Sequence, residues 1–264
     1  MKLEKNYHKD HPIIVGLAGK AATGKTSVAE AIVPKGSINS PVRNGIFWDH
    51  IFFALPIYEL ASIRKNILGA RQADRQLFAI HEAVYDIFGK TALGSIPSYD
   101  DFTKLVKDIM DLPVDSANYK PRSFLQKAGD LCRQYDPECF AKWGILKATR
   151  LFFQYTRTEL YEESEMPMAV IISDVRFKSE ADSILKQPNG IIICYETSDE
   201  IRNERMMKRD GHLMTTDQKN HQSEQQMEYI KSVSSAIIDS STLTVEGQTE
   251  KTLDIISQYT KAYA

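Results

Sequence analysis

The sequence predicts an α/β fold of three layers, in which helices cover both faces of a parallel sheet. Short apolar runs at 12–18, 168–172 and 190–195 have the length and composition of buried parallel strands. Segments with helical periodicity separate these runs, as crossover connections between parallel strands require. The first run leads into a glycine-rich segment, which predicts a ligand-binding turn at the carboxyl edge of the sheet.

The composition is typical of a globular protein with one large core. Of the 264 residues, 42% are apolar and 26% are charged. The net charge of -2 provides no general basic field, so nucleic acid is not an expected partner. No run reaches the roughly 18 apolar residues of a membrane helix, so we expect no membrane association and a cytoplasmic location. Cys132, Cys139 and Cys194 lack zinc-site spacing, so we expect buried, reduced thiols.

Residues 19–26 match the phosphate-binding pattern G-x-x-x-x-G-K-[ST], also called Walker A. The glycines allow the backbone to wrap a polyphosphate, and the helix that follows points its positive end at the same anion. Lys25 adds a full positive charge, and the hydroxyl of Thr26 is suited to bind Mg²⁺. We therefore expect this loop to bind a nucleotide through Gly19, Ala21, Ala22, Thr23, Gly24, Lys25, Thr26 and Ser27.

In the first half of the chain, two strands are followed mainly by helices. We expect Asp49 at the carboxyl end of the second strand, and Pro56 interrupts the helical pattern that follows. The segment 91–120 has the weakest pattern and is interpreted as an insertion rather than part of the sheet. The expected elements after the loop are a helix at 26–32, a strand at 45–48, and helices at 51–68, 71–88 and 102–110.

The second half alternates strands and helices. Pro121 opens the first helix, because proline is favoured in a first helical turn. The expected elements are helices at 121–135 and 137–155, a strand at 168–172, a helix at 177–185, a strand at 190–195, helices at 199–209 and 215–233, a strand at 236–239 and a helix at 249–259.

Asp174 and Arg176 follow a buried strand directly. In a three-layer fold this position lies near the phosphate loop, where a carboxylate can hold magnesium-bound water or position a substrate. The alternative for Asp174 is a cap for the helix at 177–185, and for Arg176 a solvated or salt-bridged side chain.

Three arginines share one stripe of the helix at 199–209. Arg202, Arg205 and Arg209 are spaced i, i+3 and i+7, and such a face attracts the negative charge of a transferred phosphoryl group. The alternative is a solvated basic face that pairs with Glu200 and Glu204.

Three residues outside these segments are further candidates for an acceptor site. Arg122 begins a helix and Arg133 lies further along it, an arrangement suited to binding a monophosphate. Asp49 could accept a proton or bind acceptor hydroxyls, although capping of the helix that follows explains it equally well.

Together these segments resemble the P-loop nucleoside monophosphate kinase superfamily. The sequence is most similar to phage-type deoxynucleoside monophosphate kinases, with dephospho-coenzyme A kinases as close relatives. The phosphate loop is specific for the superfamily, and the segments at Arg122 and Asp174 are moderately specific for the phage-type kinases. The similar segments are Gly16-Leu17-Ala18-Gly19 with Gly24-Lys25-Thr26, Phe53 to Pro56, Arg122 to Gly129 with Arg133, Ile172 to Phe177 with Glu180, and Glu204 to Gly211 with His221 to Glu224.

The resemblance implies a three-layer α/β/α P-loop NTPase fold with a parallel sheet and helical insertions for monophosphate binding and a lid. It implies a single kinase domain over 1–264, and a homodimer is compatible with it. The implied subregions are a phosphate-binding core at 12–50, a mostly helical acceptor-binding insertion at 51–165, and a core at 166–264 with a lid at about 199–230.

The resemblance also implies roles for individual residues. Lys25 and Thr26 handle ATP with Mg²⁺, and Arg205 and Arg209 bind the transferred phosphoryl group. Acceptor monophosphate is held by Arg122, Arg133, Asp174 and Arg176. The sequence departs from the phage-type pattern at Leu55 and Tyr58, where two charges are lost.

The expected function is transfer of the γ-phosphoryl group of ATP to a (deoxy)nucleoside 5′-monophosphate. Catalysis would come from positioning and charge neutralisation, with catalytic roles for Lys25, Arg205, Arg209 and Asp174. Two alternatives remain open. One is a dephospho-coenzyme A kinase, and the other is a nucleotide-binding switch or degenerate kinase without catalysis.

Overall fold

The computed structural model describes residues 8–34, 41–66, 70–89, 98–114, 121–158, 161, 164, 166–216 and 220–261. Contacts divide the chain into two compact units, Met1–Phe52 with Lys147–Ala264 and Phe53–Leu146. We call them the sheet unit and the helical unit and describe each by itself. The helical unit falls inside the range 51–165 that was expected to form the acceptor-binding insertion.

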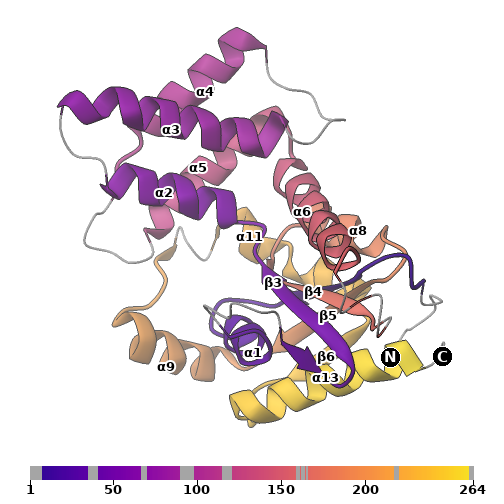
Figure 1. Cartoon of the computed structure of the whole chain (residues 1–264). Helices are drawn as coiled ribbons and strands as arrows, with labels where there is room; N and C mark the ends of the chain where they lie inside the picture. The colour runs from indigo at the N-terminus through magenta and orange to yellow at the C-terminus, as the bar shows by residue number, and fades with distance from the viewer. Residues whose placement is uncertain are drawn as a thin grey trace. The chain divides into compact units, whose positions relative to one another are not determined.

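The described part of the sheet unit is built on β1 Ile13–Ala18, β2 Val42–Arg43, β3 Ile46–Ile51, β4 Met168–Val175, β5 Gly190–Glu196 and β6 Ala236–Asp239 (Figure 1). Their order across the sheet is β2-β3-β4-β1-β5-β6. Each neighbouring pair is parallel except β2 with β3. The predicted α/β fold is confirmed, and the sheet is parallel as expected except for the antiparallel pairing of β2 with β3.

Strand β1 lies at the centre of the sheet because it is apolar on both faces. All of its residues are buried, and most of β4 and β5 on either side are buried as well. The register pairs Ala18, the last residue of β1, with Val175 on one side and Cys194 on the other. The carboxyl ends of these three strands therefore lie at one edge, where the phosphate loop begins.

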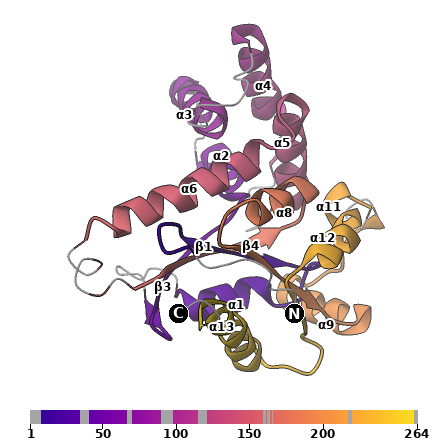
Figure 2. The same cartoon turned by 90° about the vertical axis from the view of Figure 1, so that its right-hand side faces the viewer.

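Helices cover both faces of this sheet (Figure 2). Helices α1 Lys25–Ile32 and α13 Val245–Lys261 pack against each other on one face. Helices α8 Lys178–Leu185 and α12 Met227–Val233 pack on the other. The connection from β5 to α12 contains α9 Asp199–Asp210 and α11 Gln222–Gln225. The expected three layers are thus present.

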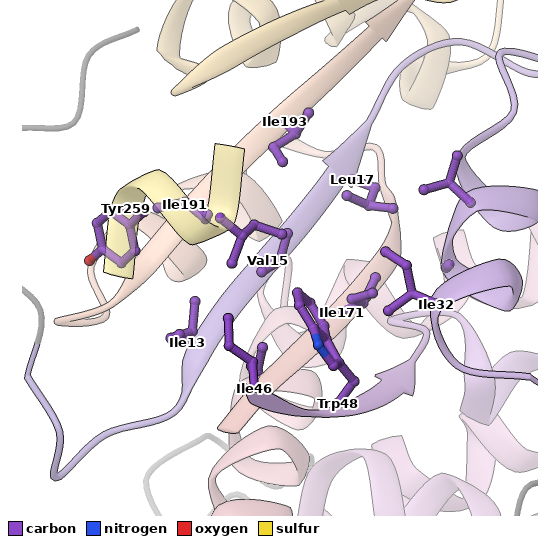
Figure 3. Packing of buried hydrophobic residues seen from close by; sticks show 14 of the residues in the cluster. Ile13, Val15, Leu17, Ile32, Ile46, Trp48, Ile171, Ile191, Ile193 and Tyr259 are labelled. Carbon is purple, nitrogen blue, oxygen red and sulfur yellow. The ribbon is translucent and has the colours of Figure 1, made fainter. Parts of the chain in front are cut away.

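A buried apolar cluster joins the sheet to α1 and α13 (Figure 3). Ile13, Val15 and Leu17 come from alternate positions of β1, whose side chains point to the same face. They meet Ile32 of α1 and Tyr259 of α13, and none of the five residues is exposed. Burial of side chains of this size contributes roughly 1.5–3 kcal/mol each. This packing holds the base of the phosphate loop in place.

The helical unit contains α2 Leu55–Asn66, α3 Ala70–Gly89, α4 Tyr99–Asp111, α5 Arg122–Tyr135 and the beginning of α6 Cys139–Tyr155, which continues into the sheet unit. Helix α4 is capped by Ser98, whose Oγ accepts a hydrogen bond from the backbone N–H of Asp101 (3.2 Å). Its buried face carries Phe102, Leu105 and Ile109, at the spacing of one helical stripe. Helix α4 therefore packs into the helical unit through one apolar face.

One short strand was not predicted from the sequence. Residues Asn44 and Gly45 have φ angles of 54° and 71°, and they connect β2 to β3 in a tight hairpin that pairs Val42 with Phe47. An Asn-Gly pair is a strong signal for such a turn, because both central residues need positive φ. The sequence signal was therefore present beside the predicted strand at 45–48.

Several predicted boundaries were wrong. Asp49 lies inside β3 and Asp174 inside β4, so neither follows its strand. Pro56 does not interrupt a helix, because α2 begins at Leu55 and a first-turn proline needs no hydrogen-bond donor. The helix expected at 215–233 is divided into α11 and α12 by Gln226, and α13 begins earlier than expected, at Val245. Residues 91–97, 115–120 and 217–219 of the predicted segments lie outside the described residues.

All three cysteines are buried free thiols, as expected. Burial raises the pKa of Cys132 to about 12 and that of Cys194 to about 11.

Over the described ranges, none of the helices is long and apolar enough to cross a membrane.

A matched pair of glycine substitutions tests the packing of the sheet unit. A Cβ at Gly190 would overlap the backbone carbonyl of Ile184, whereas a Cβ at Gly247 in α13 would make only ordinary contacts, the nearest at 3.6 Å from Leu243. We expect Gly190→Ala to lower the free energy of unfolding by about 2 kcal/mol or more. We expect Gly247→Ala to raise it by about 0.5 kcal/mol. Urea unfolding measures both, and equal effects would contradict the packing at Gly190.

Candidate phosphate-binding site

The phosphate loop turns sharply at two glycines. Gly19 follows β1 with a φ of 137°, and a Cβ there would overlap the backbone carbonyl oxygen of Tyr195. Gly24 has a φ of 100°, and a Cβ there would lie 2.5 Å from Oε1 of Gln248. Backbone conformation disfavours a side chain at both positions, and at Gly19 the fixed backbone of Tyr195 leaves no space for one either. The glycines of the sequence motif are required by this geometry.

Helix α1 begins immediately after the loop. Its N-cap is Gly24, which supplies no side-chain hydrogen bond to the first turn. Backbone N–H groups at a helix start without such a cap are available to an anion, which the helix dipole also attracts. Thr26 and Ser27 on this turn are exposed, so their hydroxyls can reach a ligand.

Lys25 is buried beneath the loop and is 5% exposed. Its Nζ donates hydrogen bonds to the carbonyl oxygens of Gly19 (2.6 Å) and Lys20 (2.8 Å) and to Oγ1 of Thr23 (3.2 Å). Burial lowers the pKa of Lys25 to about 7, and the positive charge of Arg176 acts in the same direction. Glu224 opposes both. A phosphate ligand would favour the charged form, because an opposite charge stabilises it.

The arginines of α9 have three different environments. Arg202 is 9% exposed, and its Nε donates to the carbonyl oxygen of Ala21 (3.0 Å). Arg205 donates to the carbonyl oxygens of Ser240 (2.8 Å) and, more weakly, Ala22 (3.4 Å). Arg209 pairs with Asp210 through two hydrogen bonds of 2.7 and 2.6 Å. The predicted stripe thus exists on the helix, but two of its members contact the phosphate loop itself.

Apolar packing also joins α9 to the loop. Met206 of α9 and Met214 form a small buried cluster with Ala21, and Ala22 packs against it. Helix α9, predicted to begin a lid, is therefore in contact with the phosphate loop along its middle turns.

The residues after β4 lie beside the start of the loop. The pairing of Ala18 with Val175 includes one extra residue in β4, a bulge that redirects side chains near Asp174. Arg176 forms an ion pair with the largely buried Glu224 (3.4 Å). Oε2 of Glu180 accepts hydrogen bonds from the backbone N–H groups of Arg176 (2.8 Å) and Phe177 (3.0 Å). The start of α8 is thus satisfied by Glu180, which fixes this turn.

A histidine and a serine from neighbouring strands meet at the same edge. Nε2 of His50 on β3 and Oγ of Ser173 on β4 are hydrogen-bonded at 2.8 Å, and Ser173 is 1% exposed. The adjacent Asp49 accepts the backbone N–H of His50 (2.7 Å), and burial raises the pKa of its carboxyl. Sequence reasoning singled out Asp49 but not the contact between His50 and Ser173, because only the strand register brings them together.

Arg122 and Arg133 belong to the helical unit, both on α5. They are eleven residues apart, which places them on one face but about 16 Å apart along the axis. Cζ of Arg133 lies 4.8 Å from the centre of the Phe140 ring. The two guanidinium groups therefore belong to different turns of the same helix face.

The residues present fit a magnesium ion that is bound mainly through phosphate. The described residues contain no cluster of three His, Cys, Asp or Glu side chains able to hold a metal ion. The exposed hydroxyl of Thr26 and the carboxylate of Asp174 are oxygen ligands of the type that Mg²⁺ uses alongside substrate phosphates and water.

Comparison with known proteins gives little further information. No protein-family model matches the chain, and no curated protein matches it. Among solved structures, the chain is similar to "Crystal structure of TT1252 from Thermus thermophilus", with 14% sequence identity and a TM-score of 0.40 over 93% of this chain and 96% of that chain.

The lowered pKa of Lys25 predicts how stability depends on pH. The folded pKa is about 7 and the ordinary value is 10.5, so between these values the unfolded chain binds more protons than the folded one. The free energy of unfolding should therefore rise with pH above 7, and stay flat below it, relative to Lys25→Met. Urea unfolding of both proteins below, near and above pH 7 measures this difference. A difference that is constant with pH would contradict the burial of an ionisable Lys25.

Proposed function

We propose that this protein is a magnesium-dependent kinase that transfers the γ-phosphoryl group of ATP to a (deoxy)nucleoside 5′-monophosphate. The observation that carries the proposal is the position of Lys25. It is buried under a loop bounded by Gly19 and Gly24, at a helix start that has no side-chain cap. A lysine beside a glycine-rich loop and a helix start without a side-chain cap are groups suited to binding a polyphosphate.

On the donor side, the loop would surround the β- and γ-phosphates. Lys25 would exchange the carbonyl oxygens of Gly19 and Lys20 for phosphate oxygens, which carry more negative charge. Thr26 would hold Mg²⁺, which neutralises charge on the phosphates. The loop and Lys25 would thus position the γ-phosphoryl group for in-line attack.

Charge that develops on the transferred group requires further donors. Arg205 holds carbonyl oxygens of Ala22 and Ser240, and Arg209 is exposed beside Asp210. Arg205 could turn to a phosphoryl group because its printed partners are neutral carbonyls, and Arg209 because its own side chain is 46% exposed. Removal of one preorganised donor of this kind typically costs about 100-fold to 1,000-fold in rate.

On the acceptor side, Asp174 and Arg176 supply polar groups next to the loop. Arg176 is held by Glu224, and an acceptor phosphate would replace that carboxylate as its partner. Within the helical unit, Arg122 and Arg133 share one face of α5, and their separation of about 16 Å suits two separate anionic groups better than one phosphate.

A hydroxyl acceptor, as in a dephospho-coenzyme A kinase, is the second candidate. The observation that favours it is the group of Asp49, His50 and Ser173, which lie within β3 and β4. A hydroxyl must lose a proton when it attacks phosphorus, whereas a phosphate acceptor is already an anion. The loss of two charges at Leu55 and Tyr58 relative to the phage-type pattern is compatible with a different acceptor.

Substitution of Lys25 tests the role of the loop. We expect Lys25→Ala to fold and to lower kcat/KM by at least about 100-fold, because a charge aimed at the transferred group is lost. Lys20→Ala is the matched control, since Lys20 is an exposed lysine of the same loop. ADP release with ATP, Mg²⁺ and a monophosphate measures both. Near-normal turnover by Lys25→Ala would overturn the loop-centred mechanism.

A panel of acceptors separates the candidate functions. We expect ADP release to depend on one or more (deoxy)nucleoside monophosphates. Dependence on dephospho-coenzyme A alone would instead establish a hydroxyl acceptor and give a role to Asp49 and His50. Tight ATP binding without any acceptor-dependent turnover would show a nucleotide-binding switch and contradict the kinase proposal.

A further inference from the structure

Four successive carbonyl groups of the phosphate loop accept hydrogen bonds from cationic side chains. The carbonyl oxygens of Gly19 and Lys20 accept from Lys25. Those of Ala21 and Ala22 accept from the guanidinium groups of Arg202 and Arg205 on α9. The loop therefore has cations on its carbonyl side as well as a site for an anion.

The direction of these carbonyls determines where the amide groups point. In a planar trans peptide, the C=O bond and the N–H bond of the next residue point in opposite directions. A cation that holds the carbonyl of Ala21 therefore turns the N–H of Ala22 away from that cation. A guanidinium group on this carbonyl can therefore orient an N–H group toward an anion without contacting the anion itself.

Arg202 differs from the other two cations because the proposed binding of ATP does not require its side chain to move. Lys25 is proposed to leave its carbonyls for the donor phosphates, and Arg205 holds Ala22 at only 3.4 Å. Arg202 is nine-tenths buried, and its Nε bonds Ala21 at 3.0 Å. Another of its nitrogens pairs with Asp199 at 2.5 Å, one turn earlier on α9. This leaves the guanidinium fixed between helix and loop.

The apolar contacts reinforce the same connection. Met206 lies four residues after Arg202, on the same face of α9, and is buried against Ala21. One residue of the loop is therefore held by a hydrogen bond on its carbonyl and by packing on its side chain. The middle of α9 and the loop are in this way a single structural element.

We propose that Arg202 is a positioning residue of the donor site, and that it sets the phosphate loop in its anion-binding conformation. The inference rests on the proposed binding of ATP by the loop. In this arrangement the part of α9 that carries Arg202 and Met206 belongs to the donor site.

Three variants and a control test this role. Arg202→Gln removes the charge, and Arg202→Lys keeps a donor for Ala21 without the second bond to Asp199. Asp199→Asn weakens the ion pair with Arg202. The side chain of Asp199 is 77% exposed, so we expect this variant to fold. Lys208→Gln removes an exposed positive charge from the same helix. Binding of ATP with Mg²⁺ by calorimetry, KM for ATP, KM for the acceptor, and kcat are measured for each.

We expect Arg202→Gln to weaken ATP binding about tenfold or more, since a charged hydrogen bond to a buried carbonyl is lost. Arg202→Lys should recover part of this loss, and Asp199→Asn should weaken binding about threefold. The control Lys208→Gln should bind as the wild type does. KM for the acceptor and kcat at saturating ATP should change little, because Arg202 orients the loop rather than the transferred group.

The outcomes separate the inference from the proposed function. If the wild type binds ATP and both Arg202→Gln and Asp199→Asn bind it equally well, the positioning role is wrong and the kinase proposal stands. If the affinities for ATP and for the acceptor both fall in these variants, and thermal stability falls with them, the role is only structural and the inference is overturned. If the wild type binds no ATP, the proposed function fails, and the inference with it.

Discussion

The loop at 19–26 depends on a backbone whose carbonyl groups accept hydrogen bonds from cations. Because peptide bonds are planar, each held carbonyl also fixes the direction of the next N–H group. Gly19 and Gly24 allow the turn because both have positive φ angles, and at Gly19 the backbone of Tyr195 leaves no space for a side chain. Lys25 and Arg202 then hold the carbonyls. The rest of the sheet unit positions these few groups.

The register of the sheet positions the groups of the loop. Because β1 lies between β4 and β5, the residues that follow all three strands meet at one edge. The backbone carbonyl of Tyr195, near the end of β5, fills the space that a Cβ at Gly19 would need, and a bulge near Asp174 redirects the end of β4. On the face of α1 and α13, the packing of β1 prevents the base of the loop from shifting. Site geometry therefore follows from core packing.

Lys25, Arg176 and Glu224 form a group of interacting charges beside the loop. Burial and the nearby Arg176 disfavour the ammonium form of Lys25, and Glu224 is the carboxylate that offsets them. The same Glu224 pairs with Arg176. A bound phosphate would stabilise the ammonium form of Lys25, as the carboxylate of Glu224 does.

The sequence by itself determined the fold class, most helices and strands, and the loop at 19–26, because these features depend on local patterns of apolar residues and glycine. It placed Asp49 and Asp174 at strand ends, whereas the ladder continues through both, since strand length depends on the neighbouring strand. Only the tertiary structure showed that Arg202 holds Ala21, 181 residues away in the chain. The helical spacing of the arginines predicted a shared face but not its partner. Contacts of this kind depend on how α9 packs on the loop, and no local pattern in a single sequence records that packing.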